Sequence, residues 1–121
     1  MATPAKNILV GYDGTDSGRR ALAAAADLAG YASTISVAAF PSGNGAAVEA
    51  SVLLSEARDE LLRRHALGRY LDSSGDPAEA LVEKARELRA DLVVVGRTLG
   101  STASVSAQVG RSAPCDVLIV T

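Results

Sequence analysis

The sequence predicts a single α/β domain, residues 1–121, built on a parallel β-sheet with helices on both of its faces. Two observations carry this prediction. Short apolar runs alternate along the chain with longer segments of helical pattern. The short runs are continuously apolar rather than alternating with polar residues, which is typical of strands buried on both faces. A length of 121 residues suits one domain of this kind.

Strands are predicted where the apolar runs occur, at residues 7–12, 34–40, 69–73, 91–95 and 116–120. The helices between them are expected to end at about Leu28, Ala66, Arg89 and Arg111. Glycine and proline mark several of the boundaries. Gly68 is expected to end the second helix, which begins at Ala46 after a flexible loop at 41–45.

Local signals predict where two of the helices begin. Either Asp16 or Ser17 follows the first strand and can cap the first helix. Asp76 can cap the third helix, with Pro77 at the first helical position and Glu79 completing a capping box. Such side chains satisfy backbone N–H groups that the first turn of a helix leaves without partners.

The composition argues against several classes of protein. A net charge of -2 and a pI near 5.3 argue against a nucleic-acid binder with a broad basic surface. No apolar run approaches the ~20 residues that span a bilayer. Residues 1–6 do not resemble a signal peptide, and the single cysteine, Cys115, forms no intrachain disulfide. We expect a cytoplasmic protein with neither nucleic acid nor membrane as a partner.

Two loops follow strands at the edge of the sheet where ligands bind in open parallel folds. One spans residues 11–15 and the other spans residues 96–104. The second loop is rich in glycine and hydroxyl side chains and precedes a helix, whose free N–H groups suit a phosphate. Arg97, Ser101 and Ser104 offer further donors. The alternative is that these small residues only form a tight turn from strand to helix.

Asp13 also has two interpretations. Its carboxylate can accept a hydrogen bond from a ligand, such as an adenine amino group, or it can tie down its own turn. Asp13-Gly14-Thr15 also resembles part of the signature of haloacid-dehalogenase phosphatases. In those enzymes an aspartate two residues earlier is the nucleophile, but this chain has Gly11 there. The covalent chemistry of that family is therefore not expected.

The remaining candidates for chemistry have simpler explanations. His65 is the only histidine and lies in a charge-rich helical segment, so we expect a surface or packing role. Cys115 precedes an apolar strand and is expected to be a buried, inert thiol. Arg63 and Arg64 are expected on a solvated helix face. No metal site and no catalytic residue is predicted.

Four blocks in order along the chain resemble the universal stress protein family. They are Ile-Leu-Val-Gly-Tyr-Asp-Gly-Thr at 8–15, Gly-Asp-Pro-Ala-Glu-Ala-Leu at 75–81, Ala-Asp-Leu-Val-Val-Val-Gly at 90–96, and Ala-Pro-Cys-Asp-Val-Leu-Ile-Val at 113–120. The resemblance implies an adenine nucleotide alpha hydrolase-like fold, an open parallel sheet of five strands in the order 3-2-1-4-5. It also implies that the loops at Asp13 and Gly96 are neighbours, and that a homodimer forms through the edge strand at 117–120.

ATP-binding members of that family resemble one another in a loop of the form Gly-x-x-Gly, nine residues, then Gly-Ser or Gly-Thr. Gly96 and Ser104 match this pattern, whereas Ala103 replaces the last glycine and Gly100 falls one place late. The connection is also shorter than the usual loop. The resemblance therefore implies a degenerate nucleotide site. Its expected residues are Asp13, Gly14, Thr15, Ala39, Gly96, Arg97, Gly100, Ser101 and Ser104.

The predicted function is that of a non-catalytic universal stress protein, a stress-response regulator with this degenerate adenine-nucleotide site. The ligand is left open among ATP, AMP and cyclic AMP. The alternative is a homodimeric interaction module that works without a nucleotide. An enzyme ranks last, because the chain offers no activated nucleophile and no metal cluster.

Overall fold

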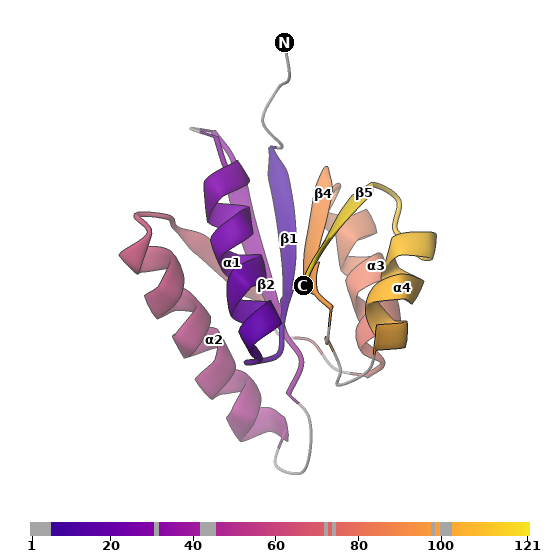
Figure 1. Cartoon of the computed structure of the whole chain (residues 1–121), viewed down its shortest axis with the longest axis horizontal. Helices are drawn as coiled ribbons and strands as arrows, with labels where there is room; N and C mark the ends of the chain where they lie inside the picture. The colour runs from indigo at the N-terminus through magenta and orange to yellow at the C-terminus, as the bar shows by residue number, and fades with distance from the viewer. Residues whose placement is uncertain are drawn as a thin grey trace.

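The structure is a computed structural model that describes residues 6–30, 32–41, 46–71, 73, 75–97, 99 and 103–121. Its strands are β1 (Asn7–Tyr12), β2 (Thr34–Ala39), β3 (Gly68–Leu71), β4 (Leu92–Gly96) and β5 (Asp116–Val120). Its helices are α1 (Asp16–Leu28), α2 (Ala46–Arg63), α3 (Pro77–Leu88) and α4 (Ala103–Ser112). The strands form one parallel sheet in the order β3-β2-β1-β4-β5, which confirms the predicted fold (Figure 1).

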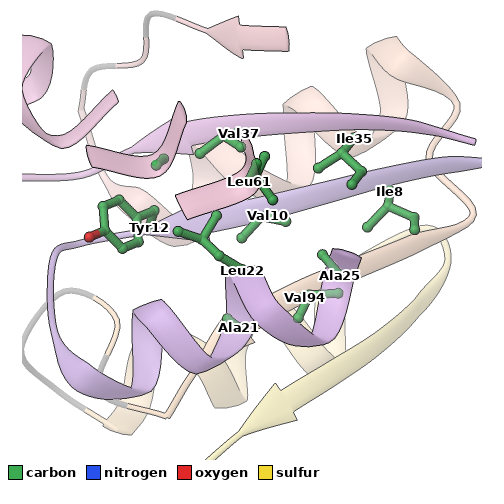
Figure 2. Packing of buried hydrophobic residues seen from close by; sticks show 11 residues of the cluster. Ile8, Val10, Tyr12, Ala21, Leu22, Ala25, Ile35, Val37, Leu61 and Val94 are labelled. Atoms are coloured by element: carbon green, nitrogen blue, oxygen red, sulfur yellow. The ribbon is translucent and has the colours of Figure 1, made fainter. Parts of the chain in front are cut away.

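Two hydrophobic cores lie on opposite faces of the sheet. On one face Ile8, Val10 and Tyr12 of β1 pack with buried residues of α1 and α2 (Figure 2). On the other face Leu9 packs with buried residues of α3 and α4. Successive strand residues point to opposite faces, so a strand covered on both sides must be apolar throughout. This confirms the prediction of buried strands for β1, β2 and β4, whereas the edge strands β3 and β5 are only partly buried.

The N-cap of α1 is Thr15, so the prediction of Asp16 or Ser17 is wrong. Thr15 has an extended backbone with φ -78° and ψ 168°, and its Oγ1 accepts a hydrogen bond from the Gly18 nitrogen at 3.2 Å. Its hydroxyl in turn donates to Asp13 Oδ1 at 2.6 Å. The cap moves one residue earlier because Asp13 holds the threonine hydroxyl in place.

The helix α2 ends earlier than predicted, at Arg63 rather than near Ala66. His65 adopts a left-handed backbone with φ 60°, which stops the helix, and the Ala66 nitrogen donates to the Leu61 carbonyl at 2.8 Å. Gly68 therefore does not end the helix as expected, and it is the first residue of β3. The predicted strand at 69–73 lies at 68–71.

The helix α3 begins as its sequence predicts. Asp76 caps it and accepts a hydrogen bond from the Glu79 nitrogen at 3.0 Å, while Pro77 takes the first helical position. Arg89 ends it in a left-handed conformation. Among the residues that the structure describes, no helix combines the length and the apolar character needed to cross a membrane.

Candidate functional site

The carboxyl ends of β1 and β4 lie side by side where the strand order reverses. β1 pairs with β2 on one side and with β4 on the other, and Gly11 is the register partner of Val95. The turn after β1 and the connection after β4 therefore leave the sheet as neighbours, at the lower end of the sheet in Figure 1. Ligands bind at this position in open parallel sheets.

The first turn of α1 lies between these two loops and contacts both. A Cβ atom added at Gly96 would lie 2.5 Å from Ser17 Oγ and 2.8 Å from the Gly18 nitrogen. A Cβ atom added at Gly18 would lie 2.8 Å from Asp13 Oδ1. Close packing around α1 therefore requires glycine at both positions. The structure places Asp13 and Gly96 against the same helical turn.

The two carboxylate oxygens of Asp13 have different surroundings. Oδ1 accepts hydrogen bonds from the Thr15 nitrogen at 3.1 Å and from Thr15 Oγ1 at 2.6 Å. Oδ2 is buried and has no hydrogen-bond partner among the described residues. Asp13 does tie down its own turn, but only with one oxygen. The other is an unsatisfied acceptor at the point where the strand order reverses.

Gly14 and Thr15 give this turn its shape. Gly14 has φ +83°, a conformation that favours glycine, and an added Cβ atom would lie 2.8 Å from Leu53 Cδ2 of α2. Thr15 caps α1 as described above. Both residues were predicted site residues, and their described contacts explain them as parts of the turn that carries Asp13.

Tyr12 lies just before Asp13 and points to the opposite face from α3 and α4. Its ring is 1% exposed, and its hydroxyl donates a hydrogen bond to Glu56 Oε1 of α2 at 3.1 Å. Burial and then the Glu56 carboxylate raise the pKa of Tyr12 to about 12, while Arg19 opposes the shift. The phenol is therefore a hydrogen-bond donor at any ordinary pH. No local pattern in the sequence links Tyr12 to Glu56, because the two residues are 44 positions apart.

Ala39 is the last residue of β2, beside the end of β1. Its carbonyl oxygen accepts a hydrogen bond from Ser73 Oγ at 2.8 Å. The Ala39 carbonyl, which was expected to lie beside a ligand, thus already has one hydrogen-bond donor. Because a carbonyl oxygen has two lone pairs, it can accept a second hydrogen bond. Ser73 was not predicted as a neighbour of Ala39, because the two residues are 34 apart and no local pattern links them.

Arg97 begins the connection from β4 to α4, and its backbone groups are both engaged. Its nitrogen donates to the Val120 carbonyl at 2.8 Å, and its carbonyl accepts from Ser106 Oγ at 3.2 Å. The side chain is exposed and forms no ion pair with the described residues. The predicted site residues Gly100 and Ser101 lie outside the described residues, as does the side chain of Ser104 in α4.

Leu99 stands three residues after Gly96, where the ATP-binding loop pattern has its second glycine. Its side chain is 1% exposed and belongs to the core that α3 and α4 cover. A Cβ atom added at Gly11 would lie 3.2 Å from Leu99 Cδ2 and 2.9 Å from Leu81 Cδ1. The connection is thus anchored by an apolar side chain, which its pattern of glycine and hydroxyl residues does not predict.

The residues set aside in the sequence lie away from this site. His65 is exposed, and Arg63 and Arg64 are exposed and both pair with Glu60. Cys115 is half-buried rather than buried as predicted, and partial burial raises the pKa of its thiol. Within the described part of the chain, no group of three or more His, Cys, Asp or Glu residues has the geometry of a metal site.

A groove with a volume of about 430 Å³ runs along α3 rather than through the meeting point of β1 and β4. Acidic side chains dominate its lining, which includes Asp76, Glu79, Glu83 and Glu87. Such a lining repels a phosphate group. We therefore place the candidate ligand site at Asp13 and not in the groove along α3.

Comparison with known proteins identifies the family. The model of the universal stress protein family matches residues 4–121. The universal stress protein Rv1636 of Mycobacterium tuberculosis is 36% identical over 139 aligned positions, which cover 95% of each chain. A solved universal stress protein in complex with cAMP has a TM-score of 0.81 at 31% identity, and covers 98% of this chain and 99% of its own.

A universal stress protein from Archaeoglobus fulgidus in complex with dAMP has the same TM-score of 0.81 at 24% identity, with 98% of this chain and 100% of its own covered. That likeness shows the fold, which is adenine nucleotide alpha hydrolase-like. The family match covers nearly the whole sequence, and the strand order agrees with it. The chain belongs to the universal stress protein family.

Proposed function

We propose that this protein is a non-catalytic, cytoplasmic stress-response regulator that binds an adenine nucleotide where β1 and β4 meet. The observation that carries this proposal is the buried Oδ2 atom of Asp13, which has no hydrogen-bond partner among the described residues. A buried acceptor without a partner costs free energy, and a ligand that donates a hydrogen bond removes that cost. The adenine amino group and the ribose hydroxyls are donors of this kind.

The charges around the site favour one orientation of the ligand. A phosphate is repelled by the carboxylate of Asp13, so the nucleoside end belongs beside that residue and beside Ala39. The phosphate end then lies toward the connection after β4, where Arg97 presents an exposed guanidinium. Gly100, Ser101 and Ser104 are proposed to complete the phosphate contacts. The complex of a 31% identical relative with cAMP supports an adenine mononucleotide as the ligand.

The connection after β4 favours a small nucleotide over ATP, which makes this a degenerate version of the ATP-binding site. Only six residues separate Gly96 from Ala103, and Leu99 among them is committed to the core. The backbone nitrogen of Arg97 is already bonded to Val120. Few donors therefore remain to surround a triphosphate, whereas one phosphate needs fewer partners. We infer that AMP or cyclic AMP fits this site better than ATP.

Catalysis is not part of the proposal. The carboxylate of Asp13 lies beside Thr15, and the only histidine, His65, is exposed at the end of α2. The Thr15 hydroxyl donates to Asp13 Oδ1 and accepts the Gly18 N–H as the cap of α1, so we assign this pair to the structure of the turn rather than to an activated nucleophile. The ligand is therefore bound and released unchanged, and the function lies in the ligand-dependent state of the protein.

A homodimeric module that works without a nucleotide is the second candidate. The strand β5 is an edge of the sheet, and its Leu118 and Ile119 are 37% and 40% exposed. An apolar edge strand of this kind is a template for pairing with a second copy. A homodimer through β5 is compatible with both functions, so nucleotide binding is what separates them.

Titration calorimetry with cyclic AMP, AMP and ATP tests the proposed function, with Asp13→Asn as the informative variant. Asparagine can keep an oxygen toward Thr15 but presents a donor where Oδ2 was an acceptor. We expect the wild-type protein to bind a mononucleotide and Asp13→Asn to bind it at least about tenfold more weakly. Asp16→Asn, at an exposed side chain three residues away, is the matched control.

Failure of the wild-type protein to bind any of the three nucleotides would sink this function. If light scattering then showed a dimer, the nucleotide-independent module would take its place. Equal affinity of Asp13→Asn and the wild-type protein would remove Asp13 from the site even if a nucleotide binds.

A further inference from the structure

Two contacts from α2 hold the turn that carries Asp13, one on each side of that residue. Before it, the Tyr12 hydroxyl donates a hydrogen bond to Glu56 Oε1 at 3.1 Å. After it, Gly14 lies against Leu53, whose Cδ2 would be 2.8 Å from a Cβ atom at that glycine. Leu53 and Glu56 are three residues apart, so they lie on the same side of α2 about one turn apart.

The bond between Tyr12 and Glu56 lies where it can control this turn. The Tyr12 ring is buried in the core between the sheet, α1 and α2, with its oxygen at the rim of the cluster (Figure 2). A buried hydroxyl needs a hydrogen-bond partner, and Glu56 supplies it. Loss of that partner favours a displacement of the end of β1. Asp13 is the next residue along the chain.

We propose that Glu56 is a positioning residue of the nucleotide site, which holds Tyr12 from α2 and thereby keeps Asp13 Oδ2 directed to the ligand. This inference rests on the proposed function. Asp13 is held from within by Thr15, through Oδ1 alone. The contacts with α2 restrain the backbone on both sides of Asp13, and so set where the second oxygen lies. Because coupling is reciprocal, a nucleotide at Asp13 also strengthens the contact of α2 with the turn.

The charge of Glu56 cannot account for such an effect. A carboxylate near an anionic nucleotide repels it, so removal of the charge alone tightens binding. Loss of the Tyr12–Glu56 hydrogen bond instead weakens nucleotide binding. Glu56→Gln removes the charge and keeps an acceptor oxygen, whereas Glu56→Ala removes both. The two variants therefore separate positioning from electrostatics.

Calorimetric affinities for cyclic AMP and AMP test the inference, at a temperature where every variant is folded. We expect Glu56→Ala to weaken binding by about fivefold or more, and Glu56→Gln to stay within about twofold of the wild-type protein. Tyr12→Phe should weaken binding as Glu56→Ala does, and the double variant no further, because both remove one interaction. Glu60→Ala, which breaks the pairs with Arg63 and Arg64 on the same helix, is the control.

A second readout needs no ligand. Amide hydrogen exchange at Thr15 and Gly18 reports the turn directly, since their N–H groups bind Asp13 Oδ1 and Thr15 Oγ1. Exchange should be faster in Glu56→Ala than in Glu60→Ala. Equal exchange, or a Glu56→Ala variant that binds as tightly as the wild-type protein, overturns the inference. If the wild-type protein binds no nucleotide, the proposed function fails, and the exchange rates alone decide whether Glu56 positions the turn.

Discussion

The β1–α1 turn and the β4–α4 connection both begin where the neighbouring strands β1 and β4 end, yet they are held in different ways. The turn is held by polar contacts within a few residues, from Thr15 to Asp13 and from Gly18 to Thr15. The connection is held by a buried apolar side chain, Leu99, and by backbone hydrogen bonds of Arg97 to distant residues. The β1–α1 turn is thus held by local polar contacts, whereas the β4–α4 connection is held by packing into the core.

This difference determines what each side can offer a ligand. The polar contacts of the β1–α1 turn leave Asp13 Oδ2 without a partner among the described residues, so the turn can offer a ligand one acceptor. In the β4–α4 connection, the backbone N–H and C=O of Arg97 already form hydrogen bonds. The polar group that this residue can still offer a ligand is its exposed guanidinium. A guanidinium suits a phosphate, which it can bind with two parallel N–H groups. In the proposed site, Asp13 is therefore expected to recognise the nucleoside, and the opposite side is expected to bind the anionic phosphate.

The largest expected effect comes from removing the apolar anchor of the connection. Leu99→Ala should lower the free energy of unfolding by about 2–5 kcal/mol, since it leaves a cavity beside Gly11 and Leu81. Urea unfolding measures this loss. Leu28→Ala makes the same change at a side chain that is 45% exposed, and should cost far less. Similar costs for the two variants would mean that Leu99 is no anchor and that the contrast between the loops fails.

The second largest effect is expected at Gly96, where β4 packs against the first turn of α1. Gly96→Ala adds a Cβ atom 2.7 Å from the Ser17 carbonyl carbon, a backbone atom that cannot move aside freely. We expect a loss of about 1–3 kcal/mol in the free energy of unfolding. Gly110→Ala is the matched control, because its added Cβ atom meets only Ile119 Cδ1 at 3.9 Å. It should be neutral or stabilising by up to about 1 kcal/mol, as alanine favours a helix.

A tolerated Gly96→Ala would show that α1 can shift away from β4. The glycine would then need another explanation, and close approach of a phosphate would be the first to test. A cost as large as expected instead supports packing as the reason for glycine at this position. Either result shows whether folding requires the glycine at the end of β4.

The sequence predicted the parts of this molecule whose causes are local. Continuous apolar runs predicted the parallel sheet, and Asp76-Pro77 predicted the start of α3, because each signal acts within a few residues. The cap of α1 was misplaced by one residue. Thr15 rather than Asp16 is the N-cap because Asp13 accepts a hydrogen bond from its hydroxyl. The capping preference of a single residue does not take such a neighbour into account.

The contacts that decide the site are not local, and this is why the sequence did not predict them. Glu56 reaches Tyr12 across 44 residues, and Ser73 reaches Ala39 across 34. Leu99 appeared only as an interruption of a glycine pattern, although it is a core residue. The resemblance to a family predicted which loops meet. It carried no information on which of their polar groups are already satisfied.

The smallest expected effect tests the polar side of the comparison through pH. Burial and Glu56 raise the pKa of Tyr12 from an ordinary value of 10.0 to about 12, so the folded protein holds the phenol proton more tightly than the unfolded chain does. That contribution to stability is complete below about pH 10 and is lost as the pH rises toward about 12. At about pH 11 the wild-type protein should have lost about 1 kcal/mol that Tyr12→Phe does not lose.

Urea unfolding at about pH 9 and about pH 11 measures this difference, and comparison with Tyr12→Phe cancels the titration of the other groups. Glu56→Gln should reduce the pH dependence without abolishing it, since burial is the larger cause of the shift and the carboxylate the smaller. Equal pH dependence in the wild-type protein and in Tyr12→Phe would place the phenol in water. The Tyr12–Glu56 hydrogen bond would then not hold the turn at Asp13, and the packing of Leu53 against Gly14 would remain as the contact from α2.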